Sequence, residues 1–164
     1  MVMDFGDRLQ RAVERGRQRR LAADRQQELA QLTEEESRAL HAQARVSLSD
    51  HVESCLRRIA AEFPGFGFQT VLSPEGFGAK IFRDDLRSRG GREMSHEYSH
   101  LEVIIRSYSS GRILEIVCRG AIANKEVLSR SFYQPLQQLD LDVFYGQVDQ
   151  WVLEYAEKYA AAGR

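Results

Sequence analysis

The chain has 164 residues, of which 43% are hydrophobic and 29% are charged, and its formal net charge is −1. This length suits one ordinary domain, and the hydrophobic fraction excludes a chain that is disordered throughout. A net charge so close to zero argues against attraction of the whole protein to nucleic acid or to an anionic membrane surface.

The first 63 residues contain no proline and have the composition of a helix almost throughout. Residues 4–32 are strongly polar, and their few large apolar side chains fall into two short groups on different sides of a helix. Two narrow, offset stripes are typical of a helix that contacts two neighbours, or one neighbour through a loose coiled coil, rather than of a core helix. The two groups are Phe5, Leu9 and Val13, and Leu21, Leu29 and Leu32.

A second helix start follows at Thr33. Its hydroxyl and Glu36 form a capping box, and three consecutive acids suit the positive end of a helix dipole. The sequence therefore predicts either one long helix or a hairpin of helices at about 4–32 and 34–62, with a further break near Ser47 as an alternative. The later part presents one apolar face at the 3.6-residue period, which we expect to cover a sheet. That face consists of Leu48, Val52, Cys55, Leu56, Ile59 and Phe63.

After Pro64 the periodicity changes to two residues, as in strands. Short polar turns separate these segments, and short links favour an antiparallel meander of four to five strands over a parallel sheet. The polar stretch 84–95, with Asp84, Asp85 and two glycines, predicts a long mobile loop between the second and third strands. The expected strands are 66–72, 77–83, 99–108, 112–122 and 127–133.

The last element is a helix over 142–160, and Asp142 is its expected cap. One side of this helix is apolar, so we expect it to pack on the sheet. The predicted fold class is therefore α+β: a long N-terminal helix or helical hairpin, an antiparallel sheet, and a C-terminal amphipathic helix. We divide the chain into a polar helical arm, 1–46, and a single globular domain, 47–164. The apolar side of the last helix consists of Phe144, Val148, Trp151, Val152, Tyr155 and Tyr159.

The most specific motif is the H-E-x-x-H pattern at residues 96–100. On a helix, His96 and His100 would face the same way and bind zinc, with Glu97 activating the metal-bound water. Over these five residues the chain resembles zinc metallopeptidases, and the resemblance implies a zinc-dependent hydrolase. The segment that follows alternates and is rich in valine and isoleucine, so His100 is expected to begin a strand, where residues four apart lie about 13 Å from each other. We therefore favour two solvated histidines and no cofactor.

Residues 8–20 hold six arginines and a single acid, Glu14. On a helix, four of these arginines fall on one side. Such a stripe would track a phosphate backbone or meet an acidic protein surface. The chain holds no nucleic-acid-reading motif, and nearby acids offer ordinary helix-surface ion pairs, so a solvated helix face is the favoured interpretation. The four arginines are Arg8, Arg11, Arg15 and Arg19.

The two cysteines, Cys55 and Cys118, are far apart and lack the spacing of a metal site. Each falls within an apolar pattern, where a free cysteine behaves as a small hydrophobe, so we expect two buried thiols in a reducing compartment. The N-terminal segment lacks the apolar core of a secretion signal, and no run approaches the roughly 18 apolar residues that span a bilayer. We expect a soluble, bacterial-like cytoplasmic protein without a membrane partner.

These patterns favour a non-enzymatic protein-interaction or scaffold module. The polar arm cannot bury its apolar stripes within itself, so we expect it to pair with a second copy of the chain or with a protein partner. Two alternatives stay open: a zinc-dependent hydrolase built on the histidine pair of 96–100, and nucleic-acid binding through the arginines of 8–20.

Overall fold

The computed structural model describes residues 4–89 and 93–164, except for the side chains of residues 29–33, 89 and 93. The chain divides into two units, Met1–Arg38 and Ala39–Arg164, and each is described by itself. The domain boundary that the sequence predicts after residue 46 stays a prediction.

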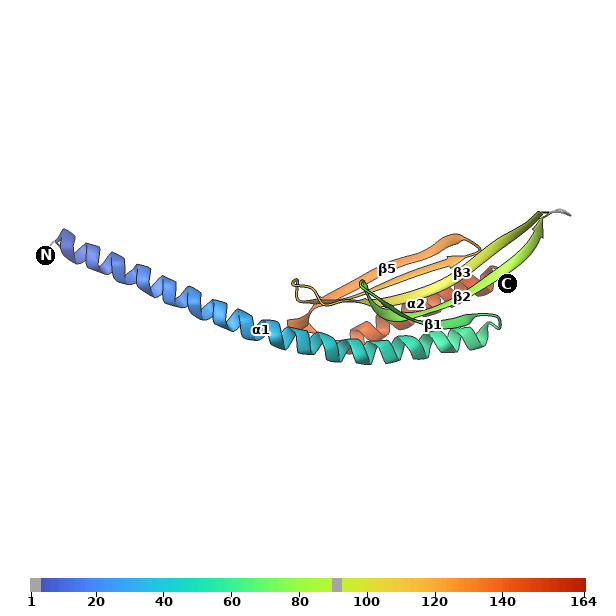
Figure 1. Ribbon diagram of the computed structural model, residues 1–164, viewed down its shortest axis with the longest axis horizontal. Helices are drawn as coiled ribbons and strands as arrows, with labels where there is room; N and C mark the ends of the chain where they lie inside the picture. Colours follow the sequence, from blue (N-terminus) through green and yellow to red (C-terminus); the bar gives the residue numbers. More distant parts are fainter. Residues whose placement is uncertain (1–3, 90–92) are drawn as a thin grey trace. The chain divides into compact units, whose positions relative to one another are not determined.

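Helix α1 (Phe5–Glu62) runs without interruption, as Figure 1 shows. The structure therefore has the long helix, and the predicted alternative of a hairpin broken after residue 32 does not form. The side chain of Thr33, which would cap the second helix, lies outside the described residues. The physical reason is composition, because no glycine or proline occurs between Gly16 and Pro64, and strong helix formers dominate this stretch. We call residues 5–38 of α1 the arm helix.

The described residues contain five antiparallel strands, which pair in chain order as a meander. This confirms the predicted α+β class with its antiparallel sheet. The turn between the last two strands consists of Ala123 and Asn124, whose φ angles are 51° and 70°; positive φ at both positions matches the twist of a tight hairpin. The strands are β1 (Gly67–Ser73), β2 (Gly76–Arg89), β3 (Glu93–Arg106), β4 (Ile113–Ile122) and β5 (Lys125–Pro135).

The stretch 84–95, predicted to be a loop, is mostly strand. β2 and β3 pair with each other along their full length, well beyond Phe82 and His100, the last residues that pair with β1 and β4. The polar composition of this stretch is the reason that the sequence predicts a loop. A two-stranded ribbon outside the core needs no apolar face, however, because each strand satisfies backbone groups of the other. The centre of the stretch, residues 90–92, lies outside the described residues.

One face of the sheet is buried beneath the helices of Ala39–Arg164. Buried residues alternate along β4 from Ile113 to Gly120, as a half-covered sheet requires. Helix α2 (Leu141–Ala161) packs against β3, β4 and β5, after a short 3-10 helix, η1 (Leu136–Gln138). The end of α1 reaches the same core, where the rings of Phe63 and Tyr159 have their centroids 4.9 Å apart.

The apolar faces predicted for the two helices are the faces that pack in the core. All six residues predicted for the last helix are buried in α2. Along α1 and at Phe63, which directly follows it, three of the predicted residues are completely buried and the other three pack partly buried against them. The buried three are Leu48, Val52 and Leu56, and the partly buried three are Cys55, Ile59 and Phe63.

The other face of the sheet carries charged side chains at its centre. Lys80, Glu102 and Arg119 occupy paired positions on β2, β3 and β4 there. Opposite charges at neighbouring positions stabilise such a face in water. Within the described part of the chain, no helix combines the length and the apolar character that crossing a membrane requires.

Gly120 on β4 sets how closely α2 approaches the sheet. A Cβ at this position would lie 2.8 Å from Cδ2 of Tyr155, whose ring is buried and whose hydroxyl donates to the Ala121 carbonyl oxygen at 2.9 Å. Because a buried, hydrogen-bonded ring cannot move aside freely, we expect Gly120→Ala to lower the free energy of unfolding by about 1–3 kcal/mol. Chemical denaturation measures the change.

Gly146 on α2 is the matched control, because no atom lies within 4 Å of its Cβ position. Gly146→Ala should raise the free energy of unfolding by about 0.5–1 kcal/mol, since alanine loses less backbone entropy in a helix. Equal effects of the two variants would contradict the close approach of α2 to Gly120.

Candidate functional site

The H-E-x-x-H residues lie in β3. Residues four apart in a strand are about 13 Å from each other, so β3 does not bring His96 and His100 together around one ion. The Nδ1 atom of His96 lies 3.4 Å from Oδ1 of Asp84. The His100 ring stacks against that of Tyr98, with the ring centroids 5.3 Å apart. The strand predicted at His100 is observed and begins earlier, at Glu93.

The turn between β4 and β5 holds this part of β3 in the extended form. The backbone N–H of Asn124 donates to the Tyr98 carbonyl at 2.8 Å, and the side-chain oxygen of Asn124 accepts from the Tyr98 N–H at 3.0 Å. The side-chain amide of Asn124 also donates to the His96 carbonyl at 2.7 Å. A helix would need these backbone groups for its own hydrogen bonds, so the turn favours a strand at the motif.

Glu97 lies on the opposite side of the strand from the two histidines, since side chains alternate in β3. It is 6% exposed. Its carboxylate forms an ion pair with Arg164 and a second one with Arg87, whose Nε lies 3.4 Å from Oε2 of Glu97. This carboxylate therefore joins two segments of the fold, and it does not face the side on which the histidines lie.

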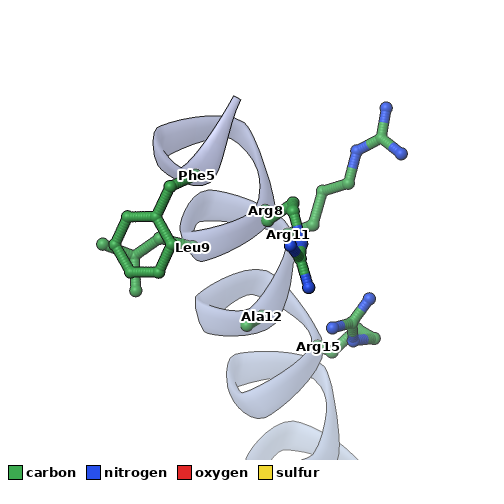
Figure 2. A pocket seen from close by; sticks show the side chains of 6 residues that line it. All are labelled: Phe5, Arg8, Leu9, Arg11, Ala12 and Arg15. Carbon is green, nitrogen blue, oxygen red and sulfur yellow. The ribbon is translucent and has the colours of Figure 1, made fainter. Parts of the chain in front are cut away.

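The four arginines predicted as a binding surface are exposed side chains of the arm helix. Figure 2 shows Arg11 and Arg15 on one side of this helix, with Phe5 and Leu9 on the other. The hollow that these side chains line is formed by residues of α1 alone, so it is a gap between neighbouring side chains rather than a ligand pocket. The arginines nevertheless provide an extended positive surface. They are Arg8, Arg11, Arg15 and Arg19.

The structure brings together three side chains that the sequence patterns did not group. His51 and Cys55 lie one turn apart on α1, and Asp149 comes from α2. His51 Nε2 is 2.8 Å from Asp149 Oδ1, and Cys55 Sγ is 3.6 Å from that nitrogen and 3.4 Å from that oxygen. We call these three residues the His–Cys–Asp cluster. Among the described residues, no other three potential metal ligands of these types come as close together.

The cluster is not arranged as a nucleophile relay. In a relay of cysteine, histidine and aspartate, the thiol and the carboxylate contact opposite nitrogens of the imidazole, so that one orients the ring toward the other. In this chain, both the Cys55 sulfur and the Asp149 oxygen approach Nε2 of His51. The three atoms therefore converge on one point, which is the arrangement that a single bound ion requires.

The free thiol of Cys55 is held in its protonated form. Its pKa is raised to about 11, first by burial and then by the hydrogen bond to Asp149 and the charge of that carboxylate. Near neutral pH the thiol is therefore protonated and donates to Asp149 Oδ1 at 3.4 Å. Because the thiolate is the nucleophilic form of cysteine, the cluster favours holding a ligand over covalent catalysis.

Buried neighbours fix both helices beside the cluster. Val52 follows His51 directly and Val148 precedes Asp149 directly, and both valines are in the core. The ring of Tyr145 lies against the imidazole of His51, with the centroids 4.7 Å apart. The side chains of His51 and Asp149 are 28% and 50% exposed, so the cluster is anchored on the core side and reachable from solvent.

Part of this cluster had a signal in the sequence. A histidine and a cysteine four residues apart lie on one face of a helix, and His51 and Cys55 have this spacing. The sequence pattern places Cys55 on the apolar face of the helix and gives no role to His51. Asp149 stands 98 residues after His51, and only the packing of α2 beside α1 brings it to the other two.

We expect Cys55 to react slowly with iodoacetamide. At pH 8, a thiol with a pKa near 11 holds about a hundredfold less thiolate than one at the ordinary value of 9.0. Asp149→Asn removes the carboxylate that helps to raise this pKa, so the variant should be alkylated faster. Mass spectrometry of the folded protein, in buffer with a chelator, gives both rates.

Cys118 is the internal control for this measurement, because it is completely buried and should stay unmodified until the protein unfolds. Alkylation of Cys55 at the rate of an unstructured peptide thiol, with no effect of Asp149→Asn, would contradict the influence of the carboxylate on the thiol.

Comparison of the chain with protein-family models, with curated proteins and with solved structures finds no match. The function is therefore argued from the chain's own residues. Two features carry that argument: the arm helix with its exposed apolar and charged side chains, and the His–Cys–Asp cluster.

Proposed function

We propose that the protein is a non-enzymatic interaction module whose arm helix pairs with the arm helix of a second copy. The observation that carries this proposal is the exposure of large apolar side chains on the arm helix. Such groups are stabilised when a partner removes them from water, and a lone helix is marginally stable without tertiary contacts. The exposed fractions are 73% for Phe5, 52% for Leu9, 45% for Val13 and 53% for Leu21.

The charges of the arm helix favour a second copy as the partner. Residues 8–20 carry six arginines and one acid, whereas residues 24–36 carry five acids and one arginine. A parallel pair of arm helices would place like charges beside each other. An antiparallel pair places the basic half of each helix against the acidic half of the other, which is the arrangement that electrostatic complementarity supports.

The antiparallel arrangement also fits a two-fold axis. Arg8 with Glu36, and Arg15 with Glu28, stand at nearly equal distances from Ala22 along the helix, so one two-fold axis near Ala22 would bring both pairs together. All four charged residues are exposed. Each pair contributes at most about 1 kcal/mol at a surface, so we expect an association of moderate strength that weakens in high salt.

Charge reversal tests the pairing. Arg8→Glu/Arg15→Glu places glutamates opposite Glu36 and Glu28 of the second copy. Glu28→Arg/Glu36→Arg places arginines opposite its Arg15 and Arg8. Each variant alone should be a monomer by sedimentation equilibrium, while the unmodified chain is a dimer. An equimolar mixture of the two variants should form one-to-one dimers, because the four positions 8, 15, 28 and 36 are then glutamate in one chain and arginine in the other.

The matched control combines all four changes, Arg8→Glu/Arg15→Glu/Glu28→Arg/Glu36→Arg, in one chain, which keeps the net charge and restores opposite charges in an antiparallel pair. This variant should retain most of the dimer. A compact monomer of the intact chain, or a mixture that stays monomeric, would overturn the proposal.

The same variants distinguish self-pairing from nucleic-acid binding. If the arginines bound a phosphate backbone, Glu28→Arg/Glu36→Arg would strengthen retention on RNA or DNA, and Arg8→Glu/Arg15→Glu would weaken it. Under self-pairing, both variants lower the association of the chain with itself. Opposite changes of the two variants in retention on RNA or DNA would therefore favour nucleic acid as the partner. Equal losses of self-association favour a second copy.

A further inference from the structure

We propose that the His–Cys–Asp cluster binds one zinc ion through His51, Cys55 and Asp149, with a fourth position open to solvent. All three residues belong to Ala39–Arg164. The inference is independent of any pairing by the arm helix, since it uses no residue of that helix.

The distances within the cluster are close to those of a zinc site. Zinc bonds of about 2.0–2.3 Å with tetrahedral angles place a sulfur ligand about 3.5 Å from a nitrogen or oxygen ligand, and nitrogen about 3.3 Å from oxygen. The Cys55 sulfur lies 3.6 Å from His51 Nε2 and 3.4 Å from Asp149 Oδ1. The nitrogen–oxygen distance is 2.8 Å, because a hydrogen bond joins these atoms. Opening it by about half an ångström completes the geometry.

Asp149 can make this movement. Its side chain is 50% exposed, and the residue before it, Val148, anchors the helix in the core. On binding, the Cys55 thiol releases its proton to solvent, and the proton of His51 resides on Nδ1 so that Nε2 binds the ion. The hydrogen bonds that join the three groups without metal are replaced by three bonds to the ion.

The donor set selects the kind of metal. A thiolate combined with an imidazole favours zinc over magnesium or calcium, which prefer oxygen ligands. Three protein ligands with one position left to water are typical of zinc sites that bind a further molecule, whereas structural sites use four protein ligands. The exposure of His51 and Asp149 leaves that fourth position on the solvent side.

Metal titration tests the site. Tag-free protein is stripped with a chelator and titrated with Zn²⁺ in competition with a coloured zinc indicator. We expect one Zn²⁺ per chain. Co²⁺ should give the intense near-ultraviolet band of a thiolate–cobalt bond. Cys55→Ser should abolish this band, and both Cys55→Ser and Asp149→Asn should weaken Zn²⁺ binding by at least about tenfold.

Two controls locate the ion. Cys118→Ser removes the other cysteine, which lies in the core, and His96→Ala/His100→Ala removes the histidine pair of β3. Both variants should bind Zn²⁺ as the unmodified chain does. Because Cys55 is partly buried, circular dichroism checks that each variant is folded, and the exposed Asp149→Asn keeps the test valid if Cys55→Ser does not fold.

Absence of stoichiometric Zn²⁺ binding at micromolar metal would overturn the site. So would a cobalt band that persists in folded Cys55→Ser, or Zn²⁺ binding that is lost in His96→Ala/His100→Ala and unchanged in Asp149→Asn. One Zn²⁺ per chain that depends on both Cys55 and Asp149 is the expected result.

Discussion

Burial of α2 against the sheet is the contact on which the unit Ala39–Arg164 depends. Six side chains of α2 enter the core, and the absence of a side chain at Gly120 lets Tyr155 reach the Ala121 carbonyl. The same packing determines where the polar side of α2 lies. Asp149 meets His51 and Cys55 because Val148, its neighbour in the chain, is fixed in the core. The candidate metal site is thus a consequence of the apolar packing beneath it.

Hydrogen bonds from the turn between β4 and β5 determine the backbone conformation of β3 at the H-E-x-x-H residues. The pattern at 96–100 would place two histidines on one face of a helix, but Asn124 uses the backbone groups of His96 and Tyr98. In the resulting strand, Glu97 turns to the other side and pairs with arginines. A motif of five residues therefore does not place its histidines together when a turn about 25 residues away fixes its backbone as a strand.

The two features that carry the functional proposals differ in how much of their packing is already formed. The His–Cys–Asp cluster is held by helices that are already packed, so a ligand would bind to groups that are largely in place. The arm helix exposes Phe5, Leu9 and Leu21, and its charges change sign along its length. In the proposed pairing, a second copy supplies the burial that these side chains lack, and the two proposals can be tested independently.

Local patterns in the sequence were sufficient to predict the α+β class, the antiparallel meander and the apolar faces of both helices. These features follow from periodicity within a single element, which the order of residues determines directly. The polar ribbon at 84–95 could not be predicted in this way, because pairing between β2 and β3, and not an apolar face, makes it a strand. The single helix α1 was one of two predicted forms, since a capping box marks a start but does not end the helix before it. Only the tertiary structure could bring Asp149 to His51 and Cys55, because that proximity depends on how α2 packs against the rest of the fold.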